Sequence, residues 1–158
     1  MEFLQWLQDS SLSIWVSESE SVWAYPTILT AHTFGLAIFV GANIVINLRL
    51  LRLAPSIPLG SLKSLFWLMW VALAINAISG GLLFVSAATK TGTNPMYWAK
   101  MVLVAISVGV FLQIRRIVLA ADATPQAAQP DRTRLLVIAS FVLWAAAITA
   151  GRLTAYCC

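Results

Sequence analysis

Residues 21–53 of the chain read SVWAYPTILTAHTFGLAIFVGANIVINLRLLRL. No charged residue occurs in this stretch before Arg49, so its uncharged run exceeds the ~20 residues that a helix needs to cross a bilayer. The stretch carries the only histidine of the chain, His32, and it closes with Arg49 and Arg52. Pro26 suits a first helical turn, where its missing N–H has no partner to lose. The pattern predicts a transmembrane helix over about residues 23–48.

Three more apolar stretches follow, which we predict to span the membrane at about residues 64–88, 96–120 and 135–156. Of the 158 residues, 60 % are apolar and 10 % are charged, whereas a soluble domain has about 25 % charged residues. An even number of spans joined by short loops favours an up-down-up-down bundle. We therefore predict an all-α integral membrane four-helix bundle, with residues 1–158 forming a single transmembrane domain.

The segments outside the spans are short. Residues 1–21 have mixed polarity and are too polar to cross a bilayer, so we expect an amphipathic segment in the interface. The alternative is an arm that docks on a neighbouring subunit. Residues 89–95 (TKTGTNP) have the composition of a turn. Cys157 and Cys158 are adjacent, which excludes a disulfide framework, and a metal site would need further ligands. The sequence assigns them no role.

Lys and Arg are distributed unevenly between the two sides of the predicted bundle. Seven belong to the first and third loops and three to the opposite side, so the positive-inside rule places the loops in the cytoplasm and both termini outside. The basic residues lie at span ends rather than in a patch, which favours phospholipid headgroups as their partners and excludes a nucleic-acid site.

Small residues four positions apart occur on three of the spans. The pairs are Ala37 with Gly41, Ala77 with Gly81, and Ala147 with Gly151. Small side chains let two membrane helices approach closely, so these pairs predict helix contacts.

Ionisable residues inside spans are costly and suggest a functional site. The candidates are His32, Lys100 and Arg152, which the predicted topology places in the outer half of the bilayer. If they face one another, they form a pocket for an anion or an acidic headgroup. Alternatively, Lys100 and Arg152 extend to the outer headgroups, and His32 is an interhelical hydrogen-bond partner.

Several amides accompany His32. Asn43 and Asn47 lie about three and four helical turns after it, and Gly35 shares the same side, so this face is predicted to pack inside the bundle. Asn76 lies near the middle of the second span. Buried amides need partners in a membrane, and we interpret Asn43, Asn47 and Asn76 as structural polar residues that bond between helices.

The residue types and motifs that the sequence lacks limit the cofactors and reactions that it can support. With one histidine, two His ligands to one haem would require a homodimer, whereas a single axial His remains available within one chain. No acidic residue lies inside a predicted span, which disfavours a carboxylate proton relay. No nucleotide-binding loop, Ser-His-Asp arrangement or zinc motif occurs, so no catalytic residue is assigned.

Four segments together resemble a known family. They are YPTILTAHTFGLAIFVGANIVINLRLL (residues 25–51), SGGLLFVSAA (79–88), NPMYWAKMVLV (94–104) and ITAGRLTAY (148–156). They resemble an uncharacterised family of four-span bacterial inner-membrane proteins, over nearly the whole chain. That resemblance implies the bacterial inner membrane, in which the termini that the positive-inside rule places outside would be periplasmic. In the resembling family a Gly commonly stands where Arg52 is, and an acid where Asn47 is.

This family is in turn distantly similar to the membrane domain of copper-resistance protein D and to the J-type protoporphyrinogen oxidase, which binds haem b. Both have a His early in the first span and an Asn, an aromatic residue and a Lys at the start of a later one. Here those positions are His32, Asn94, Trp98 and Lys100. The resemblance implies His32 as an axial ligand of haem iron and Lys100 as a partner of a propionate or substrate carboxylate.

Three functions follow from this reading. The first is binding of haem b or a porphyrin for redox or tetrapyrrole chemistry, with His32, Lys100 and Arg152 as the binding residues. The second is a non-catalytic accessory subunit of a larger membrane complex. The third is a metal or small-solute transporter, which we rank last because the spans lack acidic residues.

Overall fold

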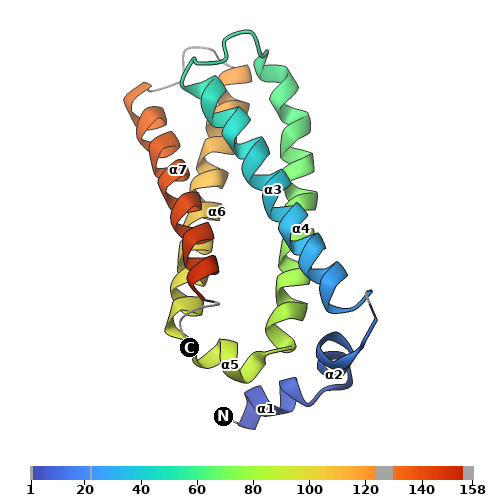
Figure 1. Ribbon diagram of the computed structural model, residues 1–158. Helices are drawn as coiled ribbons and strands as arrows, with labels where there is room; N and C mark the ends of the chain where they lie inside the picture. Colours follow the sequence, from blue (N-terminus) through green and yellow to red (C-terminus); the bar gives the residue numbers. More distant parts are fainter. Residues whose placement is uncertain (1, 22, 124–129, 155–158) are drawn as a thin grey trace.

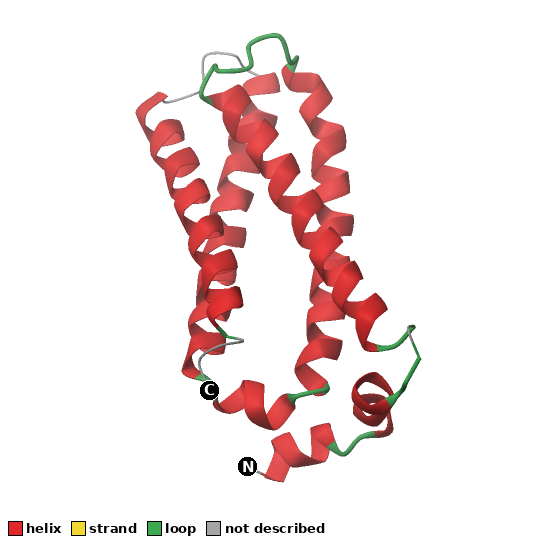
Figure 2. Ribbon diagram, in the orientation of Figure 1, coloured by secondary structure: helices red, strands yellow, loops and turns green. Residues whose placement is uncertain are grey.

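The computed structural model describes residues 2–21, 23–123 and 130–154, and every regular element in these ranges is a helix (Figure 2). In chain order they are α1 (Glu2–Gln8), α2 (Ser11–Glu18), α3 (Tyr25–Leu50), the short 3-10 helix η1 (Leu59–Ser61), α4 (Leu62–Val85), α5 (Ala88–Thr93), α6 (Pro95–Ala123) and α7 (Pro130–Leu153). Helices α3, α4, α6 and α7 are long and apolar enough to cross a membrane. The predicted four-helix membrane bundle is thus confirmed.

The bundle consists of two helix pairs. Helix α3 packs mainly along α4, and α6 packs mainly along α7, while contacts between the two pairs are fewer. Figure 1 shows residues 51–61 at one end of the bundle, which we call the loop end. Helices α1, α2 and α5 lie at the opposite end, which we call the arm end.

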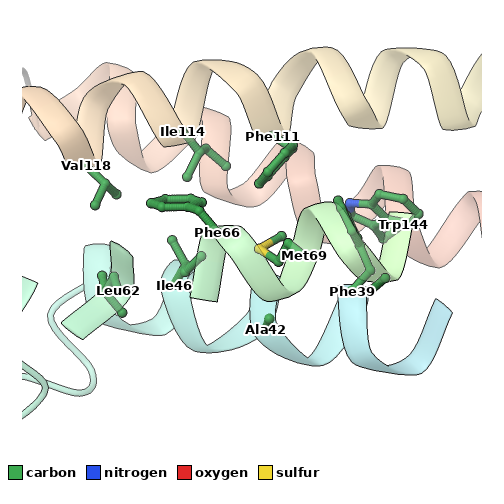
Figure 3. Close-up of a cluster of buried hydrophobic side chains, with 11 residues drawn as sticks. Phe39, Ala42, Ile46, Leu62, Phe66, Met69, Phe111, Ile114, Val118 and Trp144 are labelled. Atoms are coloured by element: carbon green, nitrogen blue, oxygen red, sulfur yellow. The ribbon is translucent and has the colours of Figure 1, made fainter. Parts of the chain in front are cut away.

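The two pairs are joined by a hydrophobic cluster in the half of the bundle nearer the loop end (Figure 3). Phe39 of α3 has ring centroids 5.2 Å from Phe111 and 5.0 Å from Trp144. Such tilted and edge-on arrangements are those that aromatic rings prefer. The other buried members are Ala42, Ile46, Leu62, Phe66, Met69, Ala72, Ile114 and Val118. Large side chains thus hold α3, α4, α6 and α7 together in this half.

The half nearer the arm end has an interior of a different kind. Most of its buried residues are small: Gly35, Ser79, Ser107, Ala147 and Ala150. Small residues allow the two helices of a pair to approach each other closely. The largest ring contact between the pairs in this half is the stack of Phe84 on Tyr97, with centroids 5.3 Å apart. His32 and Lys100 belong to the same half.

The N-terminal segment forms two short helices rather than one. They are separated at Asp9 and Ser10, and the Ser10 hydroxyl caps α2 by accepting a bond from the Ser13 amide at 3.3 Å. The Ser13 hydroxyl donates to the Val85 carbonyl at 3.1 Å. The opposite face exposes aromatic side chains, with Trp6 68 % exposed and Trp15 50 % exposed. One face thus docks on the bundle, and the other has the composition of an interfacial surface.

The prediction of a turn over residues 89–95 was wrong for most of its length, because α5 occupies Ala88–Thr93. The N-terminal segment supplies the contacts that hold this helix. The Thr89 amide donates to the Gln8 side-chain oxygen at 2.9 Å, and a Cβ on Gly92 would lie 2.9 Å from Leu4. Contacts between segments some eighty residues apart leave no signal in the local sequence.

Several helix ends also differ from the predicted span ends. Helix α4 ends at Val85 rather than near residue 88, and α7 begins at Pro130 rather than near residue 135. Pro130 and Asp131 are typical of a first helical turn, so α7 extends past its apolar stretch. Residues 155 and 156 of the predicted fourth span lie outside the described residues.

Two of the three small-residue pairs do not make the predicted helix contacts. Ala37 and Gly41 are exposed, as are Ala77 and Gly81, and a Cβ on either glycine would meet nothing within 4 Å. Ala147 is buried. Spacing alone does not show which face of a helix meets a neighbour. In α3 and α4 the close contact is made by Gly35 instead.

Helix α3 ends in a Schellman motif in which Arg52 adopts a left-handed φ of 61°. The Arg52 amide donates to the Arg49 carbonyl at 3.1 Å, and the Leu53 amide donates to the Leu48 carbonyl at 3.0 Å. A left-handed conformation costs a non-glycine residue roughly 1–2 kcal/mol. The motif therefore suits glycine at position 52.

Arg52→Gly is expected to raise the free energy of unfolding by about 1 kcal/mol, because glycine adopts this φ without a Cβ clash. Unfolding by SDS in mixed micelles, followed by circular dichroism, measures the change. Arg52→Ala removes the same charge but keeps a Cβ, so it is expected to give no gain. Equal stabilisation by glycine and alanine would show that charge, not backbone conformation, causes the effect.

Candidate functional site

His32 lies in the interface between α3 and α4 and bonds to α4 in both directions. Its Nδ1 is 3.1 Å from the Asn76 carbonyl oxygen and 3.1 Å from the Ser79 hydroxyl. The Asn76 side-chain amide donates to the His32 carbonyl at 2.7 Å. These contacts tie the two helices together and fix the orientation of the imidazole.

The partners of Nδ1 also determine where the imidazole proton lies. The Asn76 carbonyl can only accept a hydrogen bond, and the Ser79 hydroxyl donates its single proton to the Ile75 carbonyl at 2.6 Å. Both partners therefore accept, so Nδ1 carries the proton of a neutral imidazole. Nε2 then keeps its lone pair, and none of the described residues bonds to it. This is the nitrogen that a neutral histidine offers to a metal.

Glycines make room for this arrangement. A Cβ on Gly80 would lie 3.0 Å from Cε1 of His32, and a Cβ on Gly35 would lie 3.0 Å from the Ala72 carbonyl oxygen. A Cβ atom 3.0 Å from a backbone oxygen is closer than normal van der Waals contact. The close approach of α3 and α4 around His32 thus depends on glycine at both positions.

Lys100 of α6 belongs to the other helix pair but acts on the same region. Its stem lies against α7, since a Cβ on Gly151 would be 3.5 Å from the Lys100 Cε. Like His32, Lys100 belongs to the half of the bundle nearer the arm end. The structure therefore brings two of the three predicted residues to one region, with a contribution from each long helix. We call His32, Ser79, Gly80, Lys100 and Gly151 the arm-end site.

Arg152 is placed differently from His32 and Lys100. It is exposed in the last turn of α7, and no described residue bonds to its guanidinium. The preceding residue, Gly151, faces Lys100, and successive residues of a helix point about 100° apart. Arg152 consequently lies beside the arm-end site rather than within it.

The other two residues of the Asn–aromatic–Lys motif fix the start of α6, and the Asn94 side-chain nitrogen also donates to the Thr154 carbonyl, just after α7, at 3.4 Å. The Asn94 side-chain oxygen accepts a bond from the Met96 amide at 2.9 Å and so caps α6. The Trp98 indole N–H donates to the Gly92 carbonyl at 2.9 Å. Both contacts hold the start of α6 against α5 and thereby fix the depth of Lys100.

Asn43 and Asn47 form a second polar group, closer to the loop end. Their side-chain amides both donate to the hydroxyl of Ser140 on α7, at 2.9 and 3.2 Å. We call these three residues the amide cluster. The side-chain oxygens of Asn43 and Asn47 are buried and have no hydrogen-bond partner among the described residues. The polar face of α3 thus meets two neighbours, α4 through His32 and α7 through the two asparagines.

Ser140→Ala is expected to lower the free energy of unfolding by about 1–3 kcal/mol, because two buried amide groups lose their acceptor. The measurement is SDS unfolding in mixed micelles. Ser107→Ala is the matched control, since Ser107 is equally buried but bonds to the Leu103 carbonyl of its own helix. A loss of equal size in both variants would argue against an interhelical role for Ser140.

Sequence reasoning did not identify Ser140 or Gly80 as partners of the candidate residues. Single serine and glycine residues are common in apolar helices and form no pattern along the sequence. These contacts become visible only when the structure shows how α4 and α7 are rotated about their axes. Among the described residues, no three His, Cys, Asp or Glu side chains gather into a metal site. Cys157 and Cys158 lie outside the described residues.

The chain belongs to a family of unknown function, DUF6644, whose model matches residues 3–157. The family resemblance expected from the sequence motifs is thus confirmed in its general form, a family without an assigned function. Neither a curated protein nor a solved structure matches the chain.

Proposed function

We propose that this member of the family binds haem b, or a related metalloporphyrin, in the arm-end half of its membrane bundle. The observation that supports the proposal most is the state of His32. A metal-binding histidine usually donates its second ring N–H to a carbonyl or carboxylate, which fixes the tautomer and orients the ring. His32 has that arrangement, with Nδ1 bonded to the Asn76 carbonyl and with no bond from any described residue to Nε2.

The surrounding residues fit a porphyrin. Buried side chains are mostly small in this half, while the bulky core residues lie toward the loop end. Lys100 supplies a cation whose stem lies on α7, which suits a propionate. Arg152 is exposed one position further along α7 and is a second candidate partner for a propionate. A bound haem would supply one-electron chemistry, and the protein residues would orient and neutralise it.

We propose further that the protein is a bacterial inner-membrane protein with periplasmic termini. The excess of Lys and Arg in the predicted first and third loops supports this orientation. The arm-end site would then lie in the periplasmic half of the bilayer. Lipid is the immediate partner of the apolar helices, and the exposed aromatic residues of α1 and α2 would lie among the outer headgroups.

The test is an absorption spectrum of the protein purified in mild detergent from cells supplied with haem precursors, recorded oxidised and then reduced with dithionite. A Soret band that sharpens on reduction, with α and β bands, is the expected result. Pyridine haemochrome analysis of the same sample would identify haem b and give its ratio to protein. A spectrum typical of two histidine ligands would indicate a homodimer with one His32 from each chain.

A featureless visible spectrum from haem-supplied cells would contradict haem binding. The accessory-subunit function would then be favoured, and a stoichiometric partner should co-purify in a mild detergent. Metal-dependent uptake or efflux in vesicles would instead favour the transporter.

A further inference from the structure

Arg115 of α6 carries a buried hydrogen-bond donor that has no partner. Its Nε atom is buried, and none of the described residues bonds to it. Arg115 lies before Ala120, where the apolar part of α6 ends, so its backbone is roughly 7–8 Å inside the span. A cationic group at this depth is costly unless it meets an anion or another acceptor.

The chain supplies no carboxylate at this depth. Residues 21–121 contain no Asp or Glu, so α3, η1 and α4 have no acidic side chain to offer to Arg115. The nearest acid in the sequence, Asp122, lies about two turns, or ~10 Å, further along α6. An anion from outside the chain would therefore complete the surroundings of Arg115.

Arg115 lies on the side of α6 that faces α4. Tyr97 precedes it by about five helical turns and so lies on the same side of the helix. The Tyr97 ring stacks on Phe84 of α4, with centroids 5.3 Å apart. Phe111, about one turn before Arg115, lies 6.1 Å from Phe66 of α4 (Figure 3). Arg115 is thus one turn nearer the loop end than this ring contact.

A second cation lies across from Arg115 on α4. Lys63 precedes Trp70 by about two turns and so lies on the same side of α4, and Trp70 is 6.0 Å from Phe111. Lys63 and Arg115 are therefore both about one turn nearer the loop end than the contact between Phe66 and Phe111. We call the lipid-facing side of the contact between α4 and α6, with these two cations at its loop end, the α4–α6 edge.

The surroundings of the two cations favour a lipid over a free anion. Helices α4 and α6 contact each other far less than the helices within either pair do, so lipid can approach along the α4–α6 edge. Trp67 and Trp70 of α4 are 74 % and 40 % exposed there, and tryptophan is typical of the boundary between acyl chains and headgroups. Basic residues between membrane helices are typical binding sites for anionic headgroups. A free anion would gain no contact with this apolar surface.

We propose that the α4–α6 edge binds one anionic phospholipid, whose phosphate accepts hydrogen bonds from the Arg115 guanidinium and pairs with Lys63. An acyl chain of this lipid lies along the edge against Trp70. Lys and Arg at span ends attract headgroups in general, whereas a buried Nε together with a cation of a second helix specifies one position. The site lies at the opposite end of the bundle from the proposed haem site and does not depend on it.

The test compares dioleoylphosphatidylglycerol with dioleoylphosphatidylcholine, which has the same acyl chains but no net charge. Native mass spectrometry from a neutral detergent counts the bound lipids, and thermal unfolding over a range of each lipid measures the affinity, because a ligand of the folded state raises the unfolding temperature. We expect one retained phosphatidylglycerol per chain. Phosphatidylcholine should bind roughly tenfold more weakly, because its choline group repels the two cations. Inorganic phosphate at matched ionic strength should have no effect.

Three variants locate the site. Arg115→Gln removes the charge and is expected to weaken phosphatidylglycerol binding roughly tenfold, to the affinity of phosphatidylcholine. Lys63→Gln is expected to weaken it several-fold. Arg132→Gln is the matched control, since Arg132 is an exposed cation in the first turns of α7 at the same end of the bundle, and phosphatidylglycerol binding should persist. In detergent without lipid, Arg115→Gln should unfold at no lower temperature than the unaltered protein, which shows that it is folded.

Several results would overturn the proposal. Equal binding of the two lipids would show that the negative charge of the lipid is not recognised. A preference for phosphatidylglycerol that survives Arg115→Gln would place the lipid elsewhere, and an equal loss in Arg132→Gln would show general attraction to a basic surface. Stabilisation by inorganic phosphate equal to that by phosphatidylglycerol would make this an anion site without a role for acyl chains.

Discussion

His32→Ala is expected to abolish the Soret band of the purified protein. Alanine removes Nε2, the nitrogen that the proposed haem iron would bind, and the chain has no second histidine to replace it. The haem content per protein, measured as pyridine haemochrome, should fall to the background of the preparation. Iron without an axial protein ligand would be held only by propionate contacts and apolar packing.

Unfolding must be distinguished from loss of the ligand, because His32 also joins α3 to α4. Ser79→Ala is the matched control, since it removes one acceptor of Nδ1 but leaves the Asn76 carbonyl and the imidazole in place. It should keep the Soret band. Imidazole added to His32→Ala should restore the band if the variant is folded and lacks only the ligand. An unchanged band in His32→Ala would exclude His32 as the ligand.

The spans could be predicted from the sequence because the bilayer sets a length that hydropathy reports directly. Helices α3, α4, α6 and α7 differ from the predicted spans mainly at their ends, because the thickness of the bilayer does not set where a helix ends outside it. The short helix α5 was missed because its stability comes from Gln8 and Leu4, far away in the chain. Local composition describes only local preferences.

The sequence predicted how deep in the membrane the residues of the arm-end site lie, but not how each helix is rotated about its own axis. Lys100 and Arg152 both lie about one turn from the end of a span, yet one faces α7 and the other is exposed. Rotation depends on which neighbour a helix meets, and that neighbour is specified by small residues such as Gly80 and Gly151 that carry no chemistry of their own. For the same reason the polar face of α3 was visible in the sequence, whereas its partner Ser140 was not.

Gly35→Ala is expected to separate α3 from α4 at the position where they approach most closely. Its Cβ would lie 3.0 Å from the Ala72 carbonyl oxygen and 3.3 Å from the Asn76 amide nitrogen. Both neighbours are backbone atoms of one helix and cannot move aside separately, so the helices must shift apart. We expect a loss of about 1–3 kcal/mol in the free energy of unfolding, the usual cost of overpacking. Gly35→Leu should cost more.

The shift should also be visible at His32, because the Asn76 backbone both limits Gly35 and accepts the bond from Nδ1. SDS unfolding measures the stability, and the haem content of the same samples reports the geometry of the site. Gly41→Ala and Gly81→Ala are the controls: each new Cβ meets nothing within 4 Å, so alanine should be neutral or should stabilise its helix by up to ~1 kcal/mol. If Gly35→Ala behaved like these two variants, α3 and α4 would have to be further apart than the structure places them. The hydrogen bonds from His32 to Asn76 and Ser79 would then be too long to orient the imidazole.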